Sequence, residues 1–107
     1  MAGYRQNGSN EIFVNADIGK TFSACLRAAE SIGKVKQSSK TLGNISINIP
    51  MKLFPPRNPV NLKVSIMPQN NGCIVKCVGD SFDGSVGFGS VPISIDAFYN
   101  ALSSYLG

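Results

Sequence analysis

Alternating apolar and polar residues mark several short strands along this chain. Ile45, Ile47 and Ile49 alternate with Asn and Ser residues, and the segment from Val60 to Ile66 alternates in the same way. Successive side chains of a β-strand point to opposite faces, so each segment has one apolar face and one polar face. The pattern predicts half-buried strands of an antiparallel sheet that is covered on one face only.

Weaker alternation predicts further strands on either side of these two. A short first strand is expected over residues 11–16, and another over Cys73 to Gly79. Residues Val35 to Leu42 predict an edge strand, because lysines at one face of a strand discourage unwanted pairing. Gly43-Asn44 and the segment Pro68 to Gly72 are typical of turns, whereas the four prolines between positions 50 and 59 predict an irregular loop.

Two segments have the period of an amphipathic helix. In the first, the apolar stripe consists of Ile18, Phe22, Cys25, Ala29 and Ile32. Asp17 is the expected N-cap of this helix, and Gly33 the expected left-handed residue that ends it. In the second, from Ser94 to Gly107, the stripe consists of Ile95, Phe98, Leu102 and Tyr105. Ser94 is its expected cap, and Asp96 suits the positive end of the helix dipole.

The expected order of elements is therefore β-α-β-β-β-β-α. It predicts an α+β fold in which two helices pack on one face of a curled antiparallel sheet. At the level of topology this order is similar to the TATA-binding-protein-like and helix-grip folds, although no motif ties the sequence to either family. Such a similarity concerns the fold and assigns no function. Residues 1–10 are expected to form a flexible leader, and residues 11–107 a single α+β domain.

Length and composition agree with a single globular domain. The chain has 107 residues, of which 43% are hydrophobic and 15% charged, which is enough apolar surface for one core. No apolar stretch approaches the ~20 residues that cross a bilayer, so no membrane span is expected. Three cysteines make an odd count without a framework spacing, which favours reduced thiols and a cytoplasmic setting.

The positive charge is concentrated in the middle of the chain. The net charge is +4, but the segment from Ser31 to Gly79 contains seven basic residues and no Asp or Glu. Strand alternation places several of its lysines on the sheet face away from the helices. The predicted polyanion-binding residues are Lys34, Lys36, Lys40, Lys63 and Lys76. Lysine, Asn and Ser side chains on one face can hold a phosphate backbone through charge and hydrogen bonds.

The sequence offers no catalytic or metal site. It has no histidine, which removes the commonest general base and metal ligand. Cys73 and Cys77, four residues apart on one strand, are separated by ~13 Å, too far for a disulfide or a shared zinc ion. Asp80 and Asp83 are expected to be solvated turn residues. The glycine-rich segment 84–89 lacks the lysine and hydroxyl residues of a phosphate-binding loop, and Phe22, Phe98 and Tyr105 are assigned to the core.

These observations predict a binding domain that is not an enzyme and uses no cofactor. Its expected partner is acidic, either nucleic acid or an acidic protein surface. Against nucleic acid, the basic segment contains one aromatic residue, Phe54, and so lacks the stacking platform of single-strand readers. A small apolar ligand held in a pocket between the sheet and the helices is the alternative. A homodimer formed through Pro50 to Pro56 is a third reading.

Overall fold

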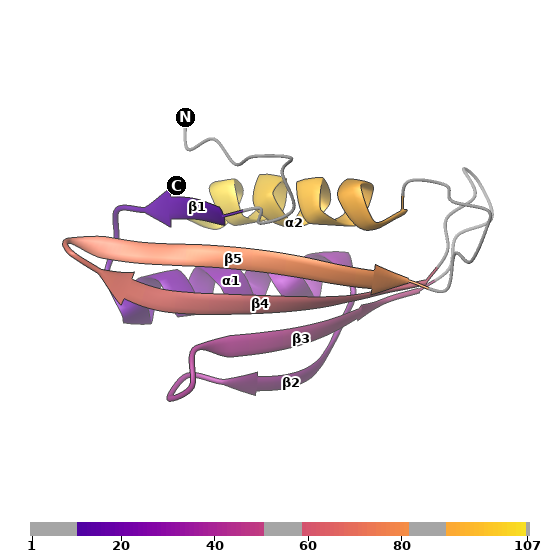
Figure 1. Ribbon diagram of the computed structural model, residues 1–107, viewed down its shortest axis with the longest axis horizontal. Coiled ribbons are helices and arrows are strands. Elements are labelled where there is room, and N and C mark those ends of the chain that lie inside the picture. Colours follow the sequence, from indigo (N-terminus) through magenta and orange to yellow (C-terminus); the bar gives the residue numbers. More distant parts are fainter. Residues whose placement is uncertain (1–10, 51–58, 82–89, 107) are drawn as a thin grey trace.

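The computed structural model describes residues 11–50, 59–81 and 90–106. The predicted order of elements is confirmed (Figure 1): β1 (Glu11–Val14), α1 (Ile18–Ile32), β2 (Lys34–Ser39), β3 (Asn44–Ile49), β4 (Val60–Gln69), β5 (Gly72–Ser81) and α2 (Ser90–Leu106). In the described residues neither helix is long and apolar enough to cross a membrane.

The five strands form one antiparallel sheet in the order β1-β5-β4-β3-β2. Both helices lie behind it and pack against each other, α1 against β2, β3 and β4 and α2 against β4 and β5 (Figure 1). The sheet is not strongly curled, so this part of the expectation was wrong. Two helices side by side cover the apolar face of this flatter sheet.

Helix α1 has the predicted bounds and the predicted buried stripe. The side chain of Asp17 accepts a hydrogen bond of 2.7 Å from the backbone N–H of Lys20, as an N-cap residue does. Gly33 ends the helix in another way than predicted, because its φ of −172° is extended rather than left-handed. A Cβ atom at Gly33 would lie 2.6 Å from the carbonyl oxygen of Asn48, so glycine permits the close approach of β3.

Helix α2 begins at Ser90, four residues before the predicted start at Ser94. Pro92 lies in its first turn, where a missing N–H disrupts no helical hydrogen bond. Ser94 is consequently buried within the helix instead of capping it, and Asp96 lies beyond the first turn. The buried aromatic partner of Phe98 is Tyr99, whose ring meets that of Phe98 edge to face with centroids 5.6 Å apart.

Tyr105 was wrongly assigned to the core. It is 42% exposed, and its ring lies on the helix layer with the guanidinium carbon of Arg27 5.9 Å from the ring centroid. The earlier start of α2 changes nothing in the helical period. The buried stripe is simply centred on Tyr99 and Leu102, which places Tyr105 at its border.

The core lies between the sheet and the helices, and the predicted strand alternation supplies it. Fully buried residues recur at every second position of β3, β4 and β5: Ile45, Ile47, Val60, Leu62, Val64, Cys73, Val75 and Cys77. Small side chains of α1, namely Ala24, Cys25, Ala28 and Ala29, allow this helix to lie close to the strands. The alternate residues of the same strands point away from the helices.

The turn between β2 and β3 requires glycine at position 43. Gly43 has a φ of +68°, its N–H donates to the carbonyl of Ser39 (2.8 Å), and its own carbonyl accepts from the N–H of Ile66 (2.7 Å). A Cβ atom there would collide with the carbonyl oxygen of Ile66. The predicted turn at Gly43 is therefore confirmed, and it also ties β3 to β4.

Candidate binding face on the open side of the sheet

The sheet surface away from the helices is the candidate site, and we call it the outer face. The strand register arranges its residues in four rows that run across the strands. In order, they are Lys34, Asn48, Asn61 and Asp80; then Gln37, Ser46, Lys63 and Val78; then Ser39, Asn44, Ser65, Lys76 and Glu11; then Met67, Ile74 and Phe13.

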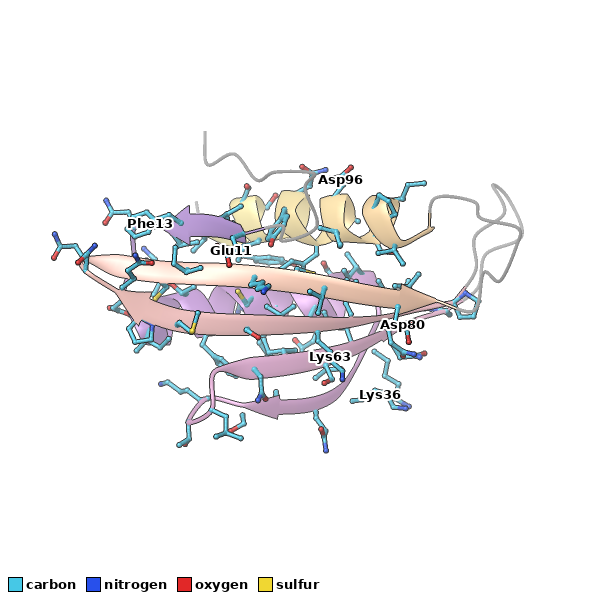
Figure 2. All side chains as sticks on the ribbon, viewed as in Figure 1. Glu11, Phe13, Lys36, Lys63, Asp80 and Asp96 are labelled. Atoms are coloured by element: carbon cyan, nitrogen blue, oxygen red, sulfur yellow. The ribbon has the colours of Figure 1, made fainter. Side chains whose placement is uncertain are left out.

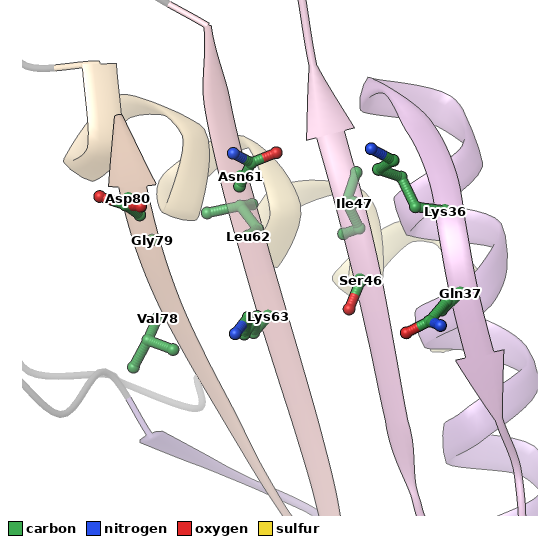
Figure 3. A pocket seen from close by; sticks show the side chains of 10 residues that line it. All are labelled: Lys36, Gln37, Ser46, Ile47, Asn61, Leu62, Lys63, Val78, Gly79 and Asp80. Atoms are coloured by element: carbon green, nitrogen blue, oxygen red, sulfur yellow. The ribbon is translucent and has the colours of Figure 1, made fainter. Parts of the chain in front are cut away.

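A shallow groove of about 780 Å³ crosses the first two rows. Its polar lining comes from four strands, with Lys36 and Gln37 on β2, Ser46 on β3, Asn61 and Lys63 on β4, and Asp80 on β5 (Figure 3). The Asn48 side-chain amide donates to the Asn61 Oδ1 over 2.9 Å, which orients the Asn61 side chain. The groove therefore offers ammonium and amide donors on an open surface.

A β-bulge in β2 changes the predicted alternation on the edge strand. Val35 pairs with Ile47, but Gln37 pairs with Ser46, so Lys36 is the extra residue. Regular alternation from Val35 would point Gln37 toward the helices, yet it lines the groove beside Lys36. One additional residue exchanges the two faces for every later position of the strand.

Lys40 is consequently absent from the outer face, contrary to the prediction. A Cβ atom at Gly19 in the first turn of α1 would lie 3.7 Å from the Lys40 Nζ, so this ammonium group lies beside the start of α1. Of the five predicted polyanion-binding lysines, the structure brings Lys34, Lys36, Lys63 and Lys76 to one face and places Lys40 on the other side of the sheet.

Two carboxylates share the outer face with these four lysines. Glu11 lies directly opposite Lys76 in the β1–β5 pairing. Asp80 was expected in a turn but belongs to β5, where it lies opposite Asn61 and lines the groove. The described outer face is therefore basic, with acidic groups at one end of two of its rows.

Exposed apolar side chains occupy the fourth row, which sequence reasoning did not connect with the lysines. Phe13 is 45% exposed and Met67 54% exposed, with the half-buried Ile74 between them. Figure 2 shows Phe13 on the same side of the sheet as Lys63 and Lys36. The sequence alternation separates Phe13 from Ile12 and Val14, but only the pairing of β1 with β5 brings it beside Lys76.

The three thiols lie in the core. Cys25, Cys73 and Cys77 are free and fully buried. Burial raises the pKa of Cys77 to about 12, and burial together with the nearby Cys77 and Cys73 thiols raises that of Cys25 to about 12. Thiols that stay protonated at neutral pH are poor nucleophiles and poor metal ligands.

The other chemical predictions are tested only in part. Among the described residues, no three His, Cys, Asp or Glu side chains are grouped to hold a metal ion. The prediction for Phe54, the predicted dimer segment Pro50 to Pro56 except Pro50 itself, and the predictions for Asp83 and the glycine-rich segment 84–89 fall outside the described residues.

A second, smaller depression lies between β1 and the last turns of α2. It has a volume of about 330 Å³ and is lined by Ile12, Val14, Leu102 and Leu106, with Lys20 among the polar residues around it. This depression lies between the sheet and α2, where the sequence analysis expected an apolar pocket.

Comparison with known proteins assigns no family. No protein-family model matches the chain, and no curated protein matches it.

Proposed function

We propose that this domain is a non-catalytic binding module that holds an acidic partner on the outer face of its sheet. The observation that supports the proposal is the convergence of Lys34, Lys36, Lys63 and Lys76, from three strands, on one open surface. Ammonium groups gathered on one surface release counterions when a polyanion binds, which favours association at low salt.

The polar side chains around the lysines support the same proposal. Asn44, Ser46, Ser65 and the hydrogen-bonded pair of Asn48 and Asn61 lie in the same rows. Hydroxyl and amide groups donate hydrogen bonds to phosphate or carboxylate oxygens and thereby fix a ligand in place. A small apolar ligand would form no hydrogen bonds with these hydroxyl and amide side chains.

The proposed absence of catalysis rests on the chain's own chemistry. It contains no histidine, and its thiols are buried with pKa values of about 12 for Cys25 and Cys77. Among the described residues that line the groove Asp80 is the one carboxylate, and it lies opposite Asn61; a lone exposed carboxylate serves recognition better than acid–base chemistry.

Titration with inorganic polyphosphate at several salt concentrations tests this function. Four lysines that each neutralise one phosphate predict a slope of log affinity against log salt of about −3. Changing Lys36 and Lys63 together to Gln should roughly halve that slope. The matched control changes Lys20 and Arg27, two exposed cations of α1, and should leave the slope unchanged.

A slope near zero for the wild-type domain would overturn the proposal. Equal losses in the two double variants would also overturn it, because net charge rather than the outer face would then drive binding.

The depression between β1 and α2 favours a small apolar ligand as the second candidate function. Its volume of about 330 Å³ lies at the lower end of the range for ligand sites, about 300 to 1,000 Å³. Titration with a fluorescent fatty acid, with Leu106→Glu as the variant that should abolish binding, tests this candidate separately from the outer face.

A further inference from the structure

We propose that the acidic partner is single-stranded nucleic acid, with one base stacked on Phe13. This inference rests on the proposed function and adds to it the class of ligand. The lysines alone fit any polyanion. The aromatic ring in the neighbouring row selects a polyanion that also carries exposed flat bases.

Phe13 is held in place by Gly72 on the adjacent strand. A Cβ atom at Gly72 would lie 2.6 Å from the Cζ and 3.1 Å from the Cε1 of Phe13, so the ring covers the glycine backbone. Yet the side chain remains 45% exposed. A ring that is packed on one side and open on the other loses little conformational entropy when a base stacks on it.

From this ring the lysines follow in successive rows and on strands progressively farther from β1, so the series runs diagonally across the sheet. Phe13 lies opposite Ile74, and Lys76 follows two residues later on β5, roughly 7 Å away along the strand. The row of Lys63 comes next, and that of Lys34 after it. The four rows therefore span about 20 Å, a length that accommodates a few nucleotides, and Lys36 flanks the far end at the groove (Figure 3).

The neutral polar residues between the lysines also suit exposed bases. Asn44 and Ser65 lie in the row of Lys76, and Asn61 lies in the groove. Amide and hydroxyl groups can pair with the Watson–Crick edges of unpaired bases, which a duplex conceals. An acidic protein would bind the same lysines but would derive nothing from stacking on Phe13.

The position of Glu11 favours a single strand over a duplex. Its carboxylate lies two residues before Phe13 and opposite Lys76, where it disfavours a dense double row of phosphates. A single strand can place a neutral base at this end and its phosphates over Lys76 and Lys63. A duplex carries phosphates on both strands, so the same approach brings one of them toward Glu11.

The test compares three polyanions against one set of variants by fluorescence anisotropy at low salt. The probes are a labelled mixed-sequence DNA strand of about 12 nucleotides, the same sequence as a duplex, and inorganic polyphosphate. We expect the wild-type domain to bind the single strand more tightly than the duplex. Phe13→Ala should weaken single-strand binding about tenfold and change polyphosphate binding less than about twofold.

Tyr105→Ala is the matched control, since Tyr105 is 42% exposed but lies on the helix layer; it should leave all affinities unchanged. Phe13→Tyr retains an aromatic ring and should keep wild-type affinity, whereas Phe13→Leu retains only apolar bulk and should not. In NMR spectra, the ring protons of Phe13 should shift upfield with the single strand and not with polyphosphate.

Two failures can be told apart. If polyphosphate and the single strand bind equally and Phe13→Ala affects neither, the stacking inference is wrong while the acidic-partner function stands. If polyphosphate shows no salt-dependent binding to the wild-type domain, the proposed function is wrong. Unequal loss without an upfield shift of the Phe13 ring would also contradict stacking.

Discussion

The two faces of the same sheet differ in almost every physical property. The inner face carries Leu62, Val64, Cys77 and their neighbours, all fully buried beneath two helices. The outer face carries Lys63, Ser65 and Val78 on the intervening positions of the same strands, open to solvent. Burial and solvent exposure therefore alternate along a single stretch of chain, so a change at a buried position should affect stability, and under the proposed function a change at an exposed position should affect binding instead.

The difference also shows which face tolerates irregularity. The inner face packs against the small side chains Ala24, Ala28 and Ala29 of α1, so this packing leaves little room for change. The outer face has a bulge at Lys36, exposed apolar groups and charged side chains of both signs. Such features are costly in a core but are tolerated on an open face, where the proposed partner would contact them.

The largest expected effect separates neighbouring residues on opposite faces. Leu62→Ala should lower the free energy of unfolding by about 2–5 kcal/mol, because it removes a fully buried side chain and leaves a cavity. Lys63→Gln should change it by less than about 0.5 kcal/mol. Urea denaturation of both variants measures the contrast, and similar losses would mean that β4 is not divided between core and surface.

A smaller effect is expected at the turn that joins β2 to β3. Gly43→Ala should cost about 1–3 kcal/mol, because φ is +68° and the added Cβ meets the carbonyl of Ile66. Gly19→Ala is the control, since its Cβ would have no contact closer than 3.5 Å and lies in a helix. Thermal unfolding should show a lower midpoint for Gly43→Ala only; an equal shift in both would contradict the turn geometry.

The buried thiols predict how the inner face responds to alkali. The folded state raises the pKa of Cys77 from about 9 to about 12 by burial, so it retains a proton that the unfolded chain releases. The stabilisation is complete below pH 9 and is lost as the pH rises toward 12. Between these values the thiol contributes up to about 1.4 kcal/mol per pH unit to the fall in unfolding free energy.

Cys77→Ala should therefore have a shallower fall in stability between pH 9 and pH 10.5 than the wild-type domain. Urea denaturation at each pH measures the two slopes, and the comparison of slopes is independent of the cavity that the substitution creates. Parallel slopes would show that the thiol of Cys77 ionises as readily in the folded domain as in the unfolded chain.

The inner face could be predicted from the sequence because burial repeats with the period of each element. The stripe of α1 and the alternation in β3 and β4 depend on local geometry alone, and the structure follows them residue by residue. Asp17 was also predictable as a cap, because its side chain bonds to a backbone N–H only three residues away. Local sequence patterns are enough to predict burial where the same contact recurs with each helical turn or each strand pleat.

The outer face was less predictable because its composition depends on pairing between distant segments. Phe13 joins the lysines only because β1 pairs with β5, which no local pattern specifies. The bulge at Lys36 likewise could not be predicted, because it lies in a run of Lys, Gln and Ser residues. Neither face of this run has a row of buried apolar side chains that would fix the strand register. Alternation is reliable only where one face must be buried.

The smallest expected effect tests this bulge through Lys40. Strand alternation without a bulge would place Lys40 on the outer face, whereas the bulge brings its ammonium group beside Gly19 at the start of α1. Lys40→Gln should therefore change polyphosphate affinity by less than about twofold. Lys63→Gln removes the same charge from the groove, so it should lower polyphosphate affinity several-fold and reduce the salt slope by about 1. Isothermal titration calorimetry of the two single variants at one low and one moderate salt concentration distinguishes them, since both lose one positive charge and share the same net charge. Equal losses would mean either that Lys40 reaches the ligand because β2 continues without the bulge, or that binding depends on net charge alone. The double variant of Lys20 and Arg27 separates these two explanations. Only the dependence on net charge predicts that this variant also loses affinity.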